Sequence, residues 1–477
     1  MSNSSLDFIF HPQSVAIVGA SENVAMLSGN YVQHLVNYGF KGNIYPINPK
    51  RPTIFGVKAY PDLKSIPGNI DYVIDCIALE DTPALLAACS QKGVQLVHVF
   101  AGRAAETGHK DSIELEQKIL QVARQYGIRL IGPNCLGIYC PGVGLSTGWD
   151  FPKEPGTVGA AIQSGGNSTD LVRWGALRGM RFSKVISYGN ALDLNESDFL
   201  EYLAGDPETR VIMCYFEGVK DGRRFFDILR SAARQKPVII LKGGRTRAGS
   251  KAASTHTASL AGSYNMWSIM IKQAGAIQAL NFDDWVDLGV AFSMVSPIKG
   301  TRVGITGGGG GRSVLSADEC EEMGFDVVPL PSDIREQIRE KAPIIWDWVG
   351  NPVDVSIMRG TSIGNAEVLT MMAKHPDFDF LIGQITEDIP SVPDDFMPKV
   401  HNEVDGYIQI FKGGLKPIVV VQSEKSLGIN EFSNWRWRLF AEARTQFVEA
   451  KVPFFPTIGR AARAVKEVIN YYQRKGS

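Results

Sequence analysis

Short runs of β-branched and other apolar residues alternate along the chain with longer stretches in which apolar positions recur every three to four residues. The first pattern is typical of buried strands, and the second is typical of amphipathic helices. The runs that predict strands are 15–18, 43–47, 72–78, 96–100, 130–131, 157–162, 184–187, 211–216, 237–241, 301–306, 380–384, 417–422 and 453–455. Such alternation favours βαβ units, in which helices cover a largely parallel sheet.

Glycine and proline divide this pattern into three series. A loop rich in both residues, 141–156, separates the first series from the second, and the second ends near Pro297. Helices are predicted over 111–126, 313–323 and 458–474. We therefore predict an α/β protein with three consecutive doubly wound domains, Rossmann-like or flavodoxin-like, at residues 1–145, 146–297 and 298–477.

Composition is consistent with this organisation and narrows the class of protein. A chain of 477 residues is longer than one hydrophobic core usually supports, so several domains are expected. With 21% charged residues and a net charge of −1, it shows no overall bias toward nucleic acid or membrane, so neither is expected as a partner. No signal peptide or long apolar segment is evident, and a cytoplasmic location is expected. The cysteines show neither CxxC nor zinc-ligand spacing, so no metal site is predicted. They are Cys76, Cys89, Cys135, Cys140, Cys214 and Cys320.

The first strand runs into Gly19, Ala20 and Ser21, small residues that let a phosphate approach backbone N–H groups at a helix start. A tight structural turn explains these residues equally well. The second strand ends in Asn48-Pro49-Lys50-Arg51 rather than in the acid typical of NAD-binding domains. Two cations suit a phosphorylated ribose, as in NADP or coenzyme A, although a solvated Lys-Arg turn is the alternative.

A further turn, Gly132-Pro133-Asn134-Cys135, follows a strand at the sheet edge where such folds bind ligands. Together with Gly19-Ala20-Ser21, Pro46-x-Asn48-Pro49 and Ala101-Gly102, it resembles the CoA-binding domain of NDP-forming acyl-CoA synthetases, which are relatives of succinyl-CoA synthetase. Arg103 departs from the aromatic residue common in that family. The resemblance implies that CoA contacts Gly19, Ala20, Ser21, Asn48, Pro49, Lys50, Asn134 and Cys135.

His256 lies in a run of small residues, 249–262, that offers little for an imidazole to pack against. Neutral imidazole is a competent nucleophile for phosphoryl groups, whereas the alternative is a solvated loop histidine. The resemblance continues through Ser187-x-Gly189-Asn190 and Lys242-Gly243-Gly244-Arg245 to this run. It implies that His256 is transiently phosphorylated.

Two further motifs suit a phosphohistidine. Gln163, Ser164, Gly165 and Gly166 lie between a strand and a helix and offer a hydroxyl and N–H groups to a phosphate. Glu217 ends a strand and could orient the imidazole, the role that the family gives to its matching glutamate, or it could only cap a turn. Lys242 and Arg245 could attract phosphate or belong to a solvated loop.

The third series resembles the second CoA-ligase domain of the family but carries Gly307–Gly311 where relatives have Asn-Ala-Gly-Gly-Pro-Gly. Ordering five glycines costs conformational entropy, which a bound phosphate-like group or a close neighbouring backbone would offset. A flexible loop is the alternative. Trp346 and Trp348 could line an acyl pocket or be buried at a domain interface.

The sequence contains neither an ATP-grasp module nor a Walker motif. The resemblance therefore implies the α subunit of an ADP-forming acyl-CoA synthetase, which interconverts acyl-CoA, ADP and phosphate with a carboxylic acid, CoA and ATP. Its partner would be an ATP-grasp β subunit that binds ATP or ADP and Mg²⁺, in an α2β2 assembly. The alternatives are an NADP-dependent oxidoreductase and a non-catalytic, CoA-binding regulatory paralogue.

Overall fold

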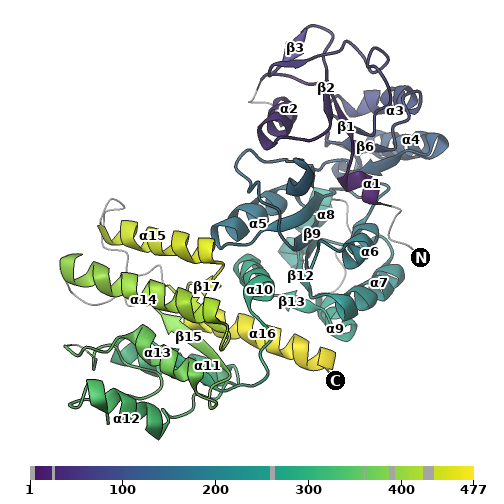
Figure 1. The fold of residues 1–477 in the computed structure, drawn as a ribbon. Coiled ribbons are helices and arrows are strands. Elements are labelled where there is room, and N and C mark those ends of the chain that lie inside the picture. The colour runs from purple at the N-terminus through teal and green to yellow at the C-terminus, as the bar shows by residue number, and fades with distance from the viewer. Residues whose placement is uncertain are drawn as a thin grey trace. The chain divides into compact units, whose positions relative to one another are not determined.

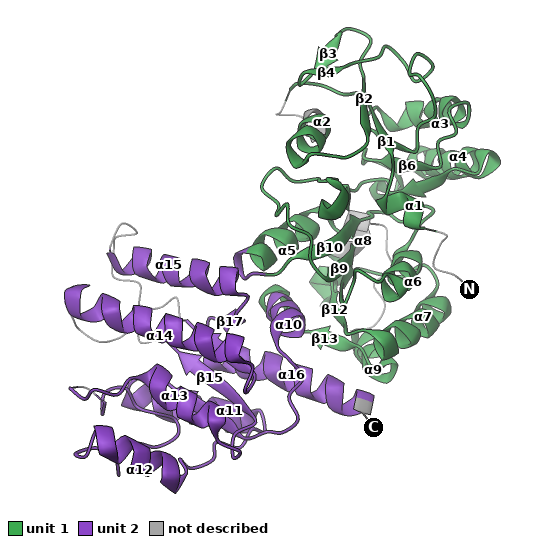
Figure 2. Cartoon of the chain, viewed as in Figure 1, with its two compact units in different colours: residues 1–176, 180–285 green, residues 177–179, 286–477 purple. Residues whose placement is uncertain are grey.

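The computed structural model describes residues 6–23, 27–257, 264–358, 360–385, 393–422 and 435–476. These residues divide into two compact units, which Figure 2 distinguishes by colour. Unit 1 comprises residues 1–176 and 180–285, and unit 2 comprises residues 177–179 and 286–477.

Unit 1 begins with a five-stranded sheet in the order β2-β1-β5-β6-β7, with every pairing parallel. This sheet occupies the purple and blue part of Figure 1. Helices α3 and α4 pack against each other beside it. The elements of this part are α1 (Asp7–Phe10), β1 (Ser14–Val18), α2 (Leu27–Tyr38), β2 (Asn43–Ile47), β3 (Thr53–Ile54), β4 (Val57–Lys58), β5 (Tyr72–Asp75), η2 (Leu79–Asp81), α3 (Thr82–Ser90), β6 (Leu96–Val99), η3 (Ala105–Thr107), α4 (Lys110–Tyr126) and β7 (Arg129–Ile131).

The rest of unit 1 forms a six-stranded sheet in the order β13-β12-β11-β9-β10-β8. Only β8 pairs antiparallel to its neighbour among these described strands. The elements are β8 (Gly137–Tyr139), η4 (Pro141–Val143), β9 (Val158–Ile162), α5 (Gly165–Leu177), β10 (Phe182–Ser187), α6 (Glu196–Gly205), β11 (Val211–Phe216), α7 (Gly222–Gln235), β12 (Val238–Lys242), α8 (Arg247–Thr257), α9 (Tyr264–Ala274) and β13 (Ile277–Ala279). Helix α10 (Phe282–Met294) begins in unit 1 and continues into unit 2.

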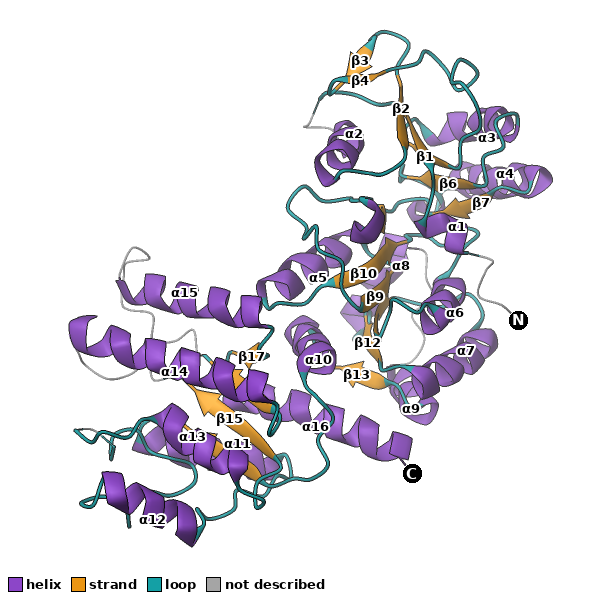
Figure 3. Ribbon diagram, in the orientation of Figure 1, coloured by secondary structure: helices purple, strands orange, loops and turns teal. Residues whose placement is uncertain are grey.

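Unit 2 has a four-stranded parallel sheet in the order β14-β15-β16-β17. Helices α13, α14 and α15 pack in succession, while α11 packs against α16. Figure 3 shows these helices around the sheet. The elements are β14 (Val303–Thr306), α11 (Gly310–Glu322), α12 (Ser332–Lys341), α13 (Asn365–Lys374), β15 (Phe380–Gln384), α14 (Pro393–Gly413), β16 (Ile418–Val421), α15 (Trp435–Ala450), β17 (Phe454–Phe455) and α16 (Ile458–Gly476).

The central strands are buried along their whole length. Every residue of β1, β9, β12 and β15 is buried, because helices cover both faces of each sheet. This explains the continuous apolar runs in the sequence. The parallel pairing and the alternation of strands with helices confirm the predicted α/β class.

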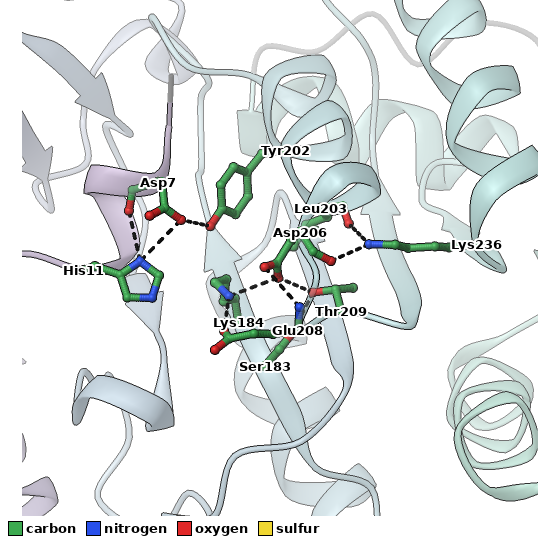
Figure 4. Close-up of polar contacts among 10 residues, drawn as sticks. All are labelled: Asp7, His11, Ser183, Lys184, Tyr202, Leu203, Asp206, Glu208, Thr209 and Lys236. Atoms are coloured by element: carbon green, nitrogen blue, oxygen red, sulfur yellow. Dashed lines mark hydrogen bonds and ion pairs between the residues drawn. The ribbon is translucent and has the colours of Figure 1, made fainter. Parts of the chain in front are cut away.

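Helix α1 is tied to helix α6, whose Tyr202 hydroxyl donates to the Asp7 carboxylate at 2.9 Å, and a buried ion-pair network lies close by (Figure 4). The fully buried ammonium of Lys184, at the start of β10, donates to the Asp206 carboxylate at 3.0 Å and also pairs with Glu208. The ring of Phe10 lies 5.9 Å from the same ammonium and stacks on Tyr202. Burial opposes the charged form, but the hydrogen bonds to Glu208 and Asp206 raise the pKa of Lys184, so the lysine remains charged beside the Phe10 ring.

The described residues contain neither a helix long and apolar enough to cross a bilayer nor a cluster of side chains suited to a metal ion. All six cysteines are free thiols. The cytoplasmic location stays a prediction.

Candidate functional site

The carboxyl ends of β1, β2 and β5 surround a cavity of about 610 Å³, a volume typical of small-molecule and cofactor sites. Five of the eight predicted CoA residues line it: Gly19, Ala20, Ser21, Asn48 and Pro49. The remaining lining residues are Val18, Ile47, Pro61, Asp62, Leu63, Lys64, Cys76, Ile77, Leu85 and Ala88. The cavity lies where open parallel sheets bind nucleotides.

Gly19 cannot be replaced by another residue without strain. Its φ of +82° is left-handed, and a Cβ atom there would approach the Cys76 carbonyl oxygen to 3.0 Å. Asn48 holds the same turn, because its side-chain amide donates to the Ala20 carbonyl at 2.8 Å while its Oδ1 accepts from the Lys50 N–H at 2.9 Å. The ends of β1 and β2 are therefore fixed around the cavity before any ligand binds.

The two cations after β2 are placed differently from one another. Arg51 pairs with Glu22 at 2.5 Å, so an acid already balances its charge. Lys50 is exposed and does not line the cavity. Lys64 does line the cavity, but it was not identified from the sequence. The one feature that could have indicated it is a positive charge in the proline-containing loop after β4.

Asn134 and Cys135 lie outside the cavity lining. Asn134 adopts a left-handed φ of +60°, and its N–H donates to the Ala101 carbonyl at 3.0 Å. Cys135 is 4% exposed, and burial raises the pKa of its thiol, which keeps the sulfur protonated and unreactive. Gly189 approaches this turn so closely that a Cβ atom would lie 2.2 Å from the Pro133 carbonyl oxygen. The turn therefore joins the two sheets of unit 1.

A second group of predicted residues meets at the carboxyl edge of the second sheet. Strands β9, β11 and β12 are neighbours there, which places Gln163, Glu217 and Lys242 together. The Gln163 side-chain oxygen accepts from the Glu217 N–H at 2.8 Å, and the Lys242 ammonium donates to the Glu217 carbonyl at 2.8 Å. Glu217 itself is 4% exposed. Its backbone is thus held from both neighbouring strands.

Lys242 is 2% exposed, so of the two predicted alternatives for this residue the solvated loop is wrong. The ammonium lies 5.1 Å from the Trp267 ring centre, and burial lowers its pKa to about 8 despite the nearby negative charge of Glu217. The sequence shows that Lys242 lies at the end of a predicted strand, but it does not show that Trp267, which is distant in the chain, covers the ammonium. Arg245 is exposed and hydrogen-bonds the Leu280 carbonyl.

Helix α5 begins at Gly165, directly after Gln163 and Ser164. The Ser164 hydroxyl accepts from the Asn167 N–H at 3.4 Å, as a helix cap does. A Cβ atom at Gly165 would lie 3.0 Å from Leu136, whereas Gly166 has no close neighbour. The first turn of a 13-residue helix thus stands beside Glu217 with small residues on its surface, an arrangement that suits an anion.

His256 belongs to helix α8, but its side chain lies outside the described residues. The small-residue run around it, which could have been a solvated loop, is helical as far as Thr257. Helix α8 packs against η3 of the first sheet's domain. Glu106 of η3 accepts from the buried Asn190 amide at 2.7 Å, which connects this segment to the end of β10.

In unit 2 the glycine-rich turn after β14 packs closely against its neighbours. A Cβ atom at Gly307 would lie 2.3 Å from the Gln384 carbonyl oxygen, and one at Gly310 would lie 3.0 Å from the Asp354 carboxylate. The Val355 N–H donates to the Gly308 carbonyl at 2.9 Å. A close neighbouring backbone, one of the two predicted explanations, therefore accounts for Gly307.

The two tryptophans of unit 2 differ in exposure. Trp346 is partly buried against the core of the unit, with the Arg339 guanidinium 5.1 Å from its ring. Trp348 is 73% exposed. Trp348 is therefore not buried at an interface within the described part of unit 2.

Comparison with known proteins bears on both sites. Residues 13–141 match the family described as CoA binding domain, and residues 155–292 match the succinyl-CoA ligase like flavodoxin domain. The α subunit of acetate–CoA ligase (ADP-forming) II from Pyrococcus furiosus is 36% identical over 378 residues, which cover 79% of this chain and 81% of that subunit. The acetate–CoA ligase (ADP-forming) I of Archaeoglobus fulgidus is 35% identical; the match covers 73% of this chain and 50% of that protein.

Among solved structures, the dinucleotide-forming acetyl-coenzyme A synthetase 1 of Ca. Korarchaeum cryptofilum, in complex with phosphate and ADP, has a TM-score of 0.82 and 27% identity. The match covers all of this chain and 98% of that one. Fold and site thus define an acyl-CoA ligase of the succinyl-CoA ligase type. The chain belongs to the family of ADP-forming acyl-CoA ligases and aligns with their α subunits. The predicted resemblance is confirmed, and the oxidoreductase alternative is not supported.

Proposed function

We propose that this chain is the α subunit of an ADP-forming acyl-CoA ligase and that His256 carries the phosphoryl group between its two half-reactions. The observation that carries the proposal is the convergence of Glu217, Gln163 and the first turn of α5 at one sheet edge. This edge belongs to the same compact unit as the cavity at Gly19–Ser21 and as helix α8.

In the first half-reaction, CoA lies in the cavity of the first sheet with its thioester near the second sheet. A phosphate oxygen attacks the thioester carbonyl, a C–O bond forms, the C–S bond breaks, and the CoA thiolate leaves and takes up a proton. The N-terminal turn of α5, at Ser164–Gly166, holds the phosphate through its N–H groups. The product is an acyl phosphate.

In the second half-reaction, a ring nitrogen of His256 attacks the phosphorus of the acyl phosphate. The P–N bond forms as the P–O bond to the carboxylate breaks, which releases the free acid. Glu217 accepts the N–H of the other ring nitrogen and stabilises the positive charge of the phosphorylated ring. The rigid backbone of Glu217 suits this task, because orientation is the main contribution that such a carboxylate makes.

The final acceptor is ADP on a separate ATP-grasp β subunit, where Mg²⁺ neutralises the phosphate charges, and the assembly is α2β2. Support comes from relatives named as α subunits, and from the A. fulgidus protein, of which this chain matches only half. Transfer of the phosphoryl group from His256 to ADP yields ATP. In the opposite direction, ATP drives formation of the CoA thioester.

Radiolabelled phosphate, supplied with acetyl-CoA or benzoyl-CoA, tests the proposal on this chain. We expect acid-labile label on the wild-type protein. In the Glu217→Gln variant, labelling should slow by about tenfold to a hundredfold, because the neutral amide stabilises the charged ring less well. CoA affinity should stay within about twofold, since the partner of Glu217 is the imidazole. Wild-type protein that binds CoA but takes up no label with either thioester would contradict the proposal and favour a regulatory CoA-binding paralogue.

A further inference from the structure

The phenol of Tyr215 stands between the carboxylate of Glu217 and the start of helix α5. Its hydroxyl donates to Glu217 Oε1 at 3.1 Å. The Asn167 side chain, on the first turn of α5, hydrogen-bonds the same phenol. Asn167 also donates its backbone N–H to the Ser164 hydroxyl at 3.4 Å. A path of hydrogen bonds therefore runs from the phosphate-binding turn to the carboxylate.

The space for this hydroxyl depends on the next strand. Gly243 follows β12, and a Cβ atom there would lie 2.4 Å from the Tyr215 hydroxyl and 3.3 Å from Glu217 Cγ. Only glycine lets the phenol and the carboxylate occupy this position together. The Tyr215 side chain thus lies close to residues that follow all three strands: Asn167 beyond β9, Glu217 after β11 and Gly243 after β12.

The chemistry of the phenol limits it to one role toward the carboxylate. Burial raises the pKa of Tyr215, and the negative charge of Glu217 raises it further, whereas the hydrogen bond from Asn167 acts in the opposite direction. The phenol stays protonated at neutral pH. It is therefore a permanent donor to Glu217 and takes no part in moving a proton.

We propose that Tyr215 is a positioning residue that orients the Glu217 carboxylate toward the imidazole of His256 and couples that orientation to the phosphate-binding turn of α5. The inference rests on the proposed phosphohistidine function. Tyr215 touches no reacting atom; it acts through Glu217. A hydrogen bond to a charged group is worth enough to change a rate by about tenfold or more when it is lost.

Tyr215→Phe removes the hydroxyl and keeps the ring. We expect the maximal rate of His256 labelling by radiolabelled phosphate and acyl-CoA to fall by about tenfold, with the half-saturating phosphate concentration and the CoA affinity within about twofold of wild type. In a Glu217→Gln background, the same substitution should change the rate by less than about twofold, because the group through which Tyr215 acts is already altered.

Tyr188→Phe is the matched control. Tyr188 directly follows the neighbouring strand β10, is fully buried, and its hydroxyl has no hydrogen-bond partner among the described residues. Loss of that hydroxyl should leave the labelling rate unchanged. A Tyr215→Phe rate equal to wild type, or an equal loss with and without Glu217, would overturn the inference while the label on wild-type protein remained. Absence of label on wild-type protein would instead overturn the proposed function.

Discussion

The Lys242 ammonium donates to the backbone carbonyl of Glu217 at 2.8 Å from a position that is almost fully buried. A buried amine is costly, and the depressed pKa of about 8 expresses that cost. The side-chain oxygen of Gln163, which follows the neighbouring strand β9, accepts a hydrogen bond from the N–H of Glu217. The turn that carries Glu217 is therefore held at both of its backbone polar groups.

Lys242→Met should slow phosphorylation of His256 while CoA binding persists. The substitution removes the ammonium that lies over the Trp267 ring and leaves the Glu217 carbonyl without its buried donor. Loss of that hydrogen bond weakens the hold on the turn by roughly 1–3 kcal/mol. The expected fall in labelling rate is about tenfold. An unchanged rate would show that Lys242 is not needed to hold Glu217 in place.

Asn48→Leu should weaken CoA binding, since it removes the side-chain hydrogen bond to Ala20 of the Gly19–Ser21 turn and the one from the Lys50 N–H that holds the Asn48 amide in place. We expect the dissociation constant, measured by calorimetry, to rise about tenfold. Arg51→Ala is the control, because Glu22 already neutralises that guanidinium, and it should change the constant by less than about twofold. A larger effect at Arg51 than at Asn48 would mean that the cation binds the ligand directly.

Asp75→Asn should stabilise the protein in a pH-dependent way. Asp75 is fully buried at the end of β5, accepts from the Thr82 hydroxyl at 2.7 Å, and burial raises its pKa to about 6. Because the folded state favours the protonated acid, stability is highest below about pH 4 and is lost as the pH rises through 6.

The neutral amide avoids this loss, which amounts to roughly 3 kcal/mol. Denaturant unfolding at pH 4.5 and pH 8 measures the difference between variant and wild type. We expect the variant to gain clearly more stability at pH 8 than at pH 4.5, where the folded carboxyl is still mostly protonated. A difference that is the same at both values would show that Asp75 does not titrate in this range.

Gly307→Ala should destabilise unit 2 by roughly 2–4 kcal/mol. The residue has a left-handed φ of +90°, and a Cβ atom would meet the Gln384 carbonyl oxygen at 2.3 Å. Gly309→Ala, two residues later, is the matched control: φ is −90° there and a Cβ atom meets nothing within 4 Å. Calorimetric unfolding should separate the two variants clearly. Equal melting temperatures would mean that the turn tolerates a side chain and that its glycines serve another purpose.

The sequence predicted strands best where they are buried on both faces. β1, β9, β11 and β12 coincide with predicted runs to within one residue, because a parallel strand covered by helices is apolar throughout. β8 was missed, since its three residues, between the Gly132–Cys135 turn and the 141–156 loop, carry no periodicity and pair only through tertiary contact with β10. The predicted strand at 72–78 stops at Asp75, where the chain turns toward η2.

The candidate site was predicted in part for similar reasons. Small residues after a strand indicated Gly19–Ser21, which line the cavity. Tyr215 was missed because it occupies an apolar strand run, where nothing distinguishes its hydroxyl from that of a core tyrosine. The contact between α8 and η3 joins segments far apart in the chain, and no local pattern encodes it.

The central claim is that His256 is the phosphoryl carrier, and mass spectrometry of the peptide that contains it tests this most directly. After incubation of the chain with phosphate and acyl-CoA, the peptide should gain the mass of one phosphoryl group, lose it in acid, and show none in His256→Ala. A wild-type peptide without that gain, or a phosphoryl group found on another residue, would contradict the account.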